Sequence, residues 1–166
     1  MTNEPRPRAA VLTVSDAGSR GERVDTAGPA CVELLRGAGF DVAFTSVVPD
    51  EPEAITEHLR RWADAERVAV VVTTGGTGLG PRDRTPEATA SVCDYLVPGI
   101  GEAMRAASLA VTPMAMISRS IAGVRGGTLI VNLPGSERGA RENLAVALPV
   151  LGHATELLRG HTAHGA

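Results

Sequence analysis

The stretch Val68-Ala69-Val70-Val71-Val72-Thr73, followed by Thr74-Gly75-Gly76-Thr77-Gly78 and soon afterwards by Thr85-Pro86, decides the fold. Its first six residues are almost continuously apolar and β-branched, which is typical of a strand covered on both faces. Thr85-Pro86 predicts the start of a helix, because Thr is a good N-cap and Pro fits the first helical turn. A buried strand, a Gly-rich turn and a helix in this order predict a βα unit of a parallel sheet.

The same alternation continues along the chain. Further strands are expected over residues 9–14, 41–48 and 127–132, and further helices over 26–38, 50–65, 99–110 and 137–158. The last helix is expected to be interrupted near Pro149, because Pro removes a helical hydrogen bond. Strands that alternate with helices predict an α/β fold with a mainly parallel sheet and helices on both faces. The length of 166 residues favours one domain over 1–166, with an ordered core over about 8–159.

The composition excludes several classes of function. The net charge is −3 and aromatic residues make up 2% of the chain, so neither electrostatics nor base stacking favours nucleic-acid binding. No segment approaches the ~20 apolar residues that span a bilayer, and no apolar stretch of signal-peptide type follows the N-terminus. Cys31 and Cys93 lack Cys-x-x-Cys spacing, which indicates reduced, buried thiols. We therefore expect a cytoplasmic protein that binds neither nucleic acid nor membranes.

Ligands of parallel sheets bind at the carboxyl ends of the strands, and this rule selects the Gly-rich loop. Glycines let backbone N–H groups approach an anion, and the following helix directs its positive end toward the same place. Arg82 and Arg84 are candidates for charge-assisted hydrogen bonds to that anion. The loop matches neither the P-loop nor G-x-G-x-x-G, so we interpret it as an anion loop of another type. The alternative is a Gly-rich turn without a ligand.

Two aspartates lie in loops selected by the same rule. Asp83 follows the glycines, and Asp50 follows the strand expected over residues 41–48. Mg²⁺ prefers oxygen ligands and binds through few carboxylates plus phosphate, which makes both residues candidate ligands. The alternative for Asp83 is an Arg-paired loop residue or an accessory helix cap. On spacing alone we favour Asp50 as an N-cap, with Glu53 completing a capping box.

Three further loops carry candidate residues. Leu133-Pro134-Gly135-Ser136 and Ser15-Asp16 each join a strand end to a helix start, where they either bind a ligand or only cap the helix. Ser118-Arg119-Ser120 and residues 123–127 precede the fourth strand and are either a phosphate-binding or a solvated loop. No nucleophile elbow and no Cys–His neighbours occur, which favours phosphoryl or nucleotidyl transfer without a covalent nucleophile.

The segment from Val72 to Ala88 resembles the signature of the molybdenum-cofactor biosynthesis family, and within it the molybdopterin adenylyltransferase branch. Other matching segments are Val14-Ser15-Asp16, Val48-Pro49-Asp50-Glu51, residues 112–120 and residues 128–136. The resemblance spans roughly residues 8–159. Many relatives have Pro after the Pro-Gly-Asn/Ser segment, whereas this chain has Glu137, which leaves the contacts of position 137 undefined.

The resemblance implies an enzyme that uses Mg²⁺ and ATP to adenylylate molybdopterin and releases pyrophosphate. It implies a three-layer α/β/α sandwich, a homotrimer, and hand-over of the product to the molybdenum-insertion protein. The family's two functional aspartates fall on Asp50 and Asp83, as catalytic and metal-binding residues. The residues expected to hold the nucleotide are Thr74, Gly75, Gly76, Thr77, Gly78, Pro134, Gly135 and Ser136. Those expected to contact the pterin or its phosphate are Ser15, Asp16, Ser118 and Arg119.

Two other functions remain open from the sequence. One is a non-catalytic molybdopterin-binding subunit, which keeps the pocket but lacks turnover. The other is a nucleotide pyrophosphate hydrolase of the related competence-damage type, which would use water and need no pterin.

Overall fold

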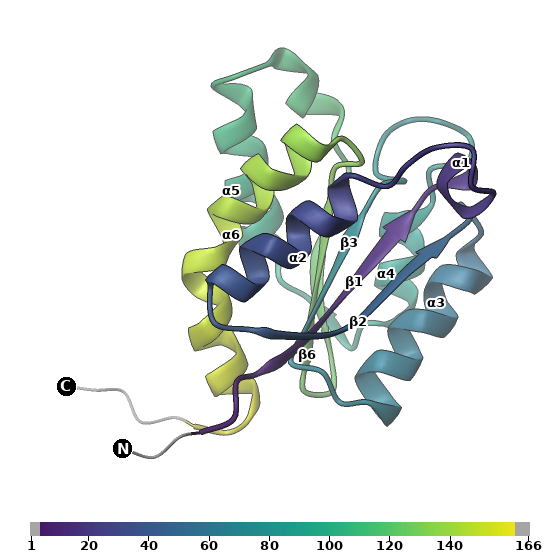
Figure 1. Cartoon of the computed structure of the whole chain (residues 1–166). Coiled ribbons are helices and arrows are strands. Elements are labelled where there is room, and N and C mark those ends of the chain that lie inside the picture. Colours follow the sequence, from purple (N-terminus) through teal and green to yellow (C-terminus); the bar gives the residue numbers. More distant parts are fainter. Residues whose placement is uncertain (1–3, 162–166) are drawn as a thin grey trace.

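A six-stranded sheet forms the middle layer of the protein in a computed structural model that describes residues 4–161 (Figure 1). The strands are β1 (Arg8–Val14), β2 (Asp41–Val48), β3 (Val70–Thr74), β4 (Tyr95–Leu96), β5 (Ala122–Arg125) and β6 (Thr128–Leu133). Their order is β2-β1-β3-β6-β5-β4. Strands β2, β1, β3 and β6 are parallel to one another. Strand β5 pairs antiparallel with both β6 and β4. The expectation of a mainly parallel sheet is confirmed. Residues 1–3 and 162–166 of the expected domain lie outside the described residues.

Helices cover both faces of this sheet. They are α1 (Asp16–Ser19), α2 (Ala27–Gly37), α3 (Pro52–Arg60), the π-helix η1 (Arg61–Ala65), α4 (Thr85–Val92), α5 (Pro98–Leu109), the 3₁₀-helix η2 (Pro113–Ile117) and α6 (Glu137–Leu158). Because neighbouring strand residues point to opposite faces, Val11 packs in one core with α2, α5 and α6, and Leu12 in another with α3 and α4. Figure 1 shows these two helix layers on either side of the sheet. The three-layer α/β/α sandwich is confirmed.

Helix α6 is not interrupted at Pro149, contrary to the sequence-based expectation. Pro149 lies on the exposed side, whereas Leu144, Ala147 and Leu151 continue the buried side of the helix past it. The Pro ring removes one hydrogen bond on the face where water can satisfy the carbonyl left without a donor. Burial of the apolar side therefore carries the helix through the proline.

The segment 123–127 was expected to be a loop, but it forms most of strand β5 and the turn that joins β5 to β6. β5 pairs with β6 through the two-residue turn Gly126-Gly127, where Gly126 has φ of 55°. Glycine adopts this left-handed conformation without strain, and such turns match the twist of hairpin strands. The side chain of Arg125, the last residue of β5, forms an ion pair with Asp64 on η1. The strand escaped prediction because it is short and contains Gly and Arg.

Within residues 4–161, no helix is long and apolar enough to cross a membrane. Cys31 is buried and Cys93 half-buried, and both thiols are free. Burial raises the pKa of Cys31 to about 12 and that of Cys93 to about 11, so both are protonated near neutrality. Their surroundings therefore do not activate either thiol as a nucleophile.

Candidate active site

Two adjoining hollows lie at the carboxyl ends of the parallel strands. Figure 1 shows α1 and the loop after β3 at this end of the sheet. The larger one, about 450 Å³, includes Ser15, Asp50, Thr74, Gly75, Gly76, Asp83, Gly135 and Ser136. The smaller one, about 300 Å³, includes Thr77, Gly78, Ser118, Pro134 and Ser136. Twelve of the fourteen sequence-predicted site residues therefore line one hollow or the other. Asp16 and Arg119 line neither.

The Gly-rich loop turns sharply between the two hollows. Gly75 and Gly76 have φ of 97° and 67°, and the Gly75 N–H donates to the Leu133 carbonyl at 3.1 Å. No acceptor is recorded in the described part of the chain for the N–H groups of Gly76, Thr77 and Gly78. Backbone donors left free in a concave loop are well suited to bind an anion such as phosphate.

Two buried hydroxyl groups lie beneath this turn without a hydrogen-bond partner among the described residues. They are Oγ1 of Thr74 and Oγ1 of Thr85. Thr85 was expected to cap α4, but it is the first residue of the helix, and its side chain approaches Gly76 instead. A buried hydroxyl without a partner is costly, which motivates a bound water or ligand at this point.

Asp50 is joined to Asp16 by two reciprocal hydrogen bonds. The Asp16 N–H donates to Oδ2 of Asp50 at 2.9 Å, and the Asp50 N–H donates to Oδ1 of Asp16 at 3.0 Å. This pair ties the loop after β1 to the loop after β2 and aims Oδ1 of Asp50 toward Gly76. The interpretation of Asp50 as a helix cap is wrong, because α3 begins at Pro52 with Glu51 as its N-cap.

Arg82 holds this pair of loops from outside. Its guanidinium bonds both carboxylate oxygens of Asp16, at 2.7 and 2.9 Å, and also Oε1 of Glu51 at 2.8 Å. The Arg82 bonds lower the pKa of Asp16 to about 2. Arg82, which the sequence favoured as an anion ligand, is engaged by two carboxylates in this structure.

Asp83 projects from the far end of the Gly-rich loop into the larger hollow. Its Oδ2 accepts the Gly80 N–H at 2.9 Å, so the side chain folds back over its own loop. No hydrogen bond is recorded within residues 4–161 for Oδ1. Asp83 also contributes, after Asp16, to the like-charge repulsion at Asp50. Two carboxylates thus lie beside the free backbone donors.

Arg119 fastens the Gly-rich loop from behind. It donates to the carbonyls of Gly78 and Asp83, each at 2.8 Å, and pairs with Glu87 on α4. Its own N–H donates to the Thr77 carbonyl at 2.9 Å. These bonds hold the loop in place and leave its N–H groups free to bind.

A sequence model described as a probable molybdopterin binding domain matches residues 10–153. The chain belongs to this family. It is 40% identical over 153 residues to a molybdopterin adenylyltransferase of Helicobacter pylori, covering 91% of this chain and 87% of that protein. It is 42% identical to gephyrin of Dictyostelium discoideum over 89% of this chain, but spans only 22% of gephyrin. A solved structure of the molybdopterin biosynthesis enzyme MoaB from Thermus thermophilus is 56% identical, with a TM-score of 0.88, over 93% of this chain and 97% of that one.

Sequence reasoning missed one carboxylate that lines the larger hollow. Asp25 lines the larger hollow, accepts the Thr13 hydroxyl at 2.7 Å through Oδ2, and accepts the Gly28 N–H at 2.9 Å through Oδ1. It lies at the end of the loop after β1, and the Asp25-x-x-Gly28 spacing before a helix was the available signal. Arg23 and Glu137 also line this hollow.

The ionisation of Asp50 gives a first prediction. Burial, opposed in part by the Asp16 N–H, raises the pKa of Asp50 above its ordinary value of 3.8. A carboxyl with a raised folded-state pKa contributes stability below that ordinary value and loses it as the pH rises through the folded-state pKa. Because an asparagine oxygen can still accept the Asp16 N–H, we expect Asp50→Asn to be slightly more stable than wild type at neutral pH in urea unfolding.

The gain should shrink as the pH falls below the ordinary value. Asp64→Asn is the control of opposite sign, because Arg125 lowers the pKa of Asp64. That variant should be less stable than wild type at neutral pH, with the difference also fading in acid. A less stable Asp50→Asn at neutral pH would show that the Asp50 charge is well compensated.

Proposed function

We propose that this protein is a molybdopterin adenylyltransferase that joins the adenylyl group of Mg-ATP to molybdopterin and releases pyrophosphate. The carrying observation is that Asp50 and Asp83 line one hollow beside the Gly-rich loop, where the N–H groups of Gly76 to Gly78 have no recorded acceptor among the described residues. The adenylyltransferase of Helicobacter pylori, similar over most of both chains, supports the same reaction.

The proposed chemistry is a direct displacement. An oxygen of the molybdopterin phosphate attacks the α-phosphorus of ATP, and the bond from that phosphorus to the bridging oxygen of the β-phosphate breaks. Two adjoining hollows that share Ser136 suit two ligands that must meet. Free backbone donors and the N-terminus of α6 at Glu137 would orient the phosphates, and positioning supplies much of the catalysis in such transfers.

The residues present fit Mg²⁺ that arrives with the nucleotide. Within residues 4–161, no three His, Cys, Asp or Glu side chains are grouped to hold a metal. Mg²⁺ commonly binds through one or two carboxylates plus substrate phosphates, and Asp50 and Asp83 provide that number. The unpartnered hydroxyls of Thr74 and Thr85 add oxygen atoms nearby. When bound, the ion would neutralise charge on the phosphates.

The roles of the remaining residues follow from their contacts. Thr74 to Gly78 with Pro134 to Ser136 would hold the nucleotide, and Ser15 and Ser118 would reach the pterin or its phosphate. Asp16 and Arg119 would act as positioning residues, because their bonds go to other parts of the loops. We further propose a homotrimer in the cytoplasm that hands its product to the molybdenum-insertion protein. Exposed apolar side chains at Leu109, Val111 and Met116 favour an assembly.

Pyrophosphate release tests this function. The protein should release pyrophosphate from Mg-ATP only when molybdopterin is present, in amounts equal to the molybdopterin consumed. Binding of molybdopterin without any release would favour the non-catalytic subunit. Release that continues without molybdopterin would favour the hydrolase, since water would then replace the pterin phosphate.

A further inference from the structure

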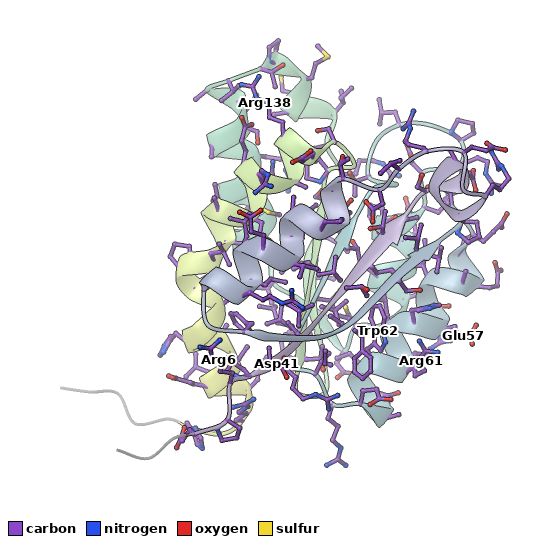
Figure 2. The ribbon with its side chains drawn as sticks, viewed as in Figure 1. Arg6, Asp41, Glu57, Arg61, Trp62 and Arg138 are labelled. Carbon is purple, nitrogen blue, oxygen red and sulfur yellow. The ribbon has the colours of Figure 1, made fainter. Side chains whose placement is uncertain are left out.

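A cavity of about 670 Å³ opens at the edge of the sheet opposite the Gly-rich loop. Buried Phe40 contributes to its wall. Five arginines surround it: Arg6, Arg8, Arg36, Arg67 and Arg159. The only acidic residue in its lining is Asp41. Figure 2 labels Arg6 and Asp41 at this lower end of the molecule. The seven residues of β1 separate this cavity from the aspartates by about 20 Å.

These arginines come from elements far apart in the sequence. They lie before and at the start of β1, in the last turn of α2, before β3, and after α6. Only Arg8 forms an ion pair within residues 4–161, with Glu66 at 3.8 Å. The other four have no carboxylate partner among the described residues, although the chain as a whole carries a net charge of −3.

Helix dipoles explain part of this arrangement. Arg36 and Arg159 lie at the carboxyl ends of α2 and α6, where positive charge is favourable. They do not explain Arg6, which precedes β1, or Arg67. Arg67 has φ of 52°, the one left-handed residue other than glycine among those described. That conformation is uncommon for Arg, and such outliers are often kept for function.

We propose that this cavity binds a small molecule that carries two or more phosphate groups. A guanidinium group can bind two phosphate oxygens at once through parallel hydrogen bonds. The volume of the cavity lies within the range of small-ligand sites. A long nucleic acid would extend beyond the cavity onto a surface of net negative charge, whereas a small anion would not. The site is separate from the aspartates and does not depend on the proposed reaction.

The test is a titration of the full chain with inorganic pyrophosphate, followed by backbone amide NMR. Two sets of shifts should appear, one at Gly76 to Gly78 and one around Arg67 and Arg159. Arg36→Glu with Arg159→Glu should weaken the second set by about 10-fold or more and leave the first unchanged. Arg6→Gln with Arg67→Gln, which leaves both helix ends intact, should weaken the same set.

The matched control is Arg60→Glu with Arg61→Glu, which makes the same charge change outside this cavity; Figure 2 labels Arg61. That pair should leave both sets of shifts as in wild type. The proposal is overturned if pyrophosphate that saturates Gly76 to Gly78 never shifts Arg67 or Arg159, or if the control weakens binding equally. It is also overturned if a single-stranded oligonucleotide displaces pyrophosphate from the cavity at lower concentration.

Discussion

Replacement of Asp83 by Asn should lower the rate of pyrophosphate release by about 10²–10⁴-fold, while folding and ligand binding survive. The amide oxygen of Asn can still accept the Gly80 N–H, so the loop should keep its path. The negative charge beside the phosphates is lost, and with it one of the two carboxylates available to Mg²⁺. The measurement is turnover with saturating Mg-ATP and molybdopterin, together with calorimetric binding of each.

Asp94→Asn is the matched control for this variant. Asp94 also accepts a loop N–H, that of Gly126 at 2.7 Å, but it lines neither hollow. Its substitution should leave turnover as in wild type. Wild-type turnover in Asp83→Asn would remove Asp83 from the mechanism, and an equal loss in both variants would point to a general effect on folding.

Gly75→Ala should lower the free energy of unfolding by about 2–4 kcal/mol and abolish ligand binding at the loop. A Cβ atom at this position would collide with the backbone carbonyl oxygen of Val14, and φ of 97° strains any residue other than glycine. The carbonyl belongs to the end of β1 and cannot move without disturbing the sheet. Urea unfolding measures the loss.

The control for the glycine is Gly152→Ala. Gly152 lies inside α6, and an added Cβ atom there meets no atom within 4 Å. Alanine should raise the free energy of unfolding by roughly 0.5–1 kcal/mol, because glycine is a poor helix former. If Gly75→Ala unfolds like wild type, the turn is more adaptable than its close contacts indicate.

Local pattern was sufficient for the elements that form the middle of the fold. The ends of the four parallel strands were predicted to within two residues. A strand covered on both faces is apolar along its length, so a run such as Val68 to Thr73 indicates where the strand begins and ends. Strand β5 was missed because its Gly123 and Arg125 have weak strand preference and are stabilised by pairing with β6. Helix α6 also continues past Pro149, because its apolar side is buried against the rest of the fold. Local helix preference could not indicate this continuation.

Those candidate site residues that directly follow a strand could be placed from the sequence. The carboxyl-end rule placed Asp50 and Asp83 in loops that meet, and the structure brings both into one hollow. Partners far apart in sequence were not predictable: Arg82 pairs with Asp16 across 66 positions, and Arg119 bonds Gly78 across 41. Which loops come together in space depends on the order of the strands in the sheet, and the sequence pattern does not specify that order.

The most direct test of the proposed adenylyl transfer is mass spectrometry of the products formed from Mg-ATP and molybdopterin. The proposal predicts molybdopterin heavier by one adenylyl group, equal in amount to the pyrophosphate released, and formed about 10²–10⁴-fold more slowly with Asp83→Asn. Free AMP with unchanged molybdopterin, or no change in either substrate, would contradict it.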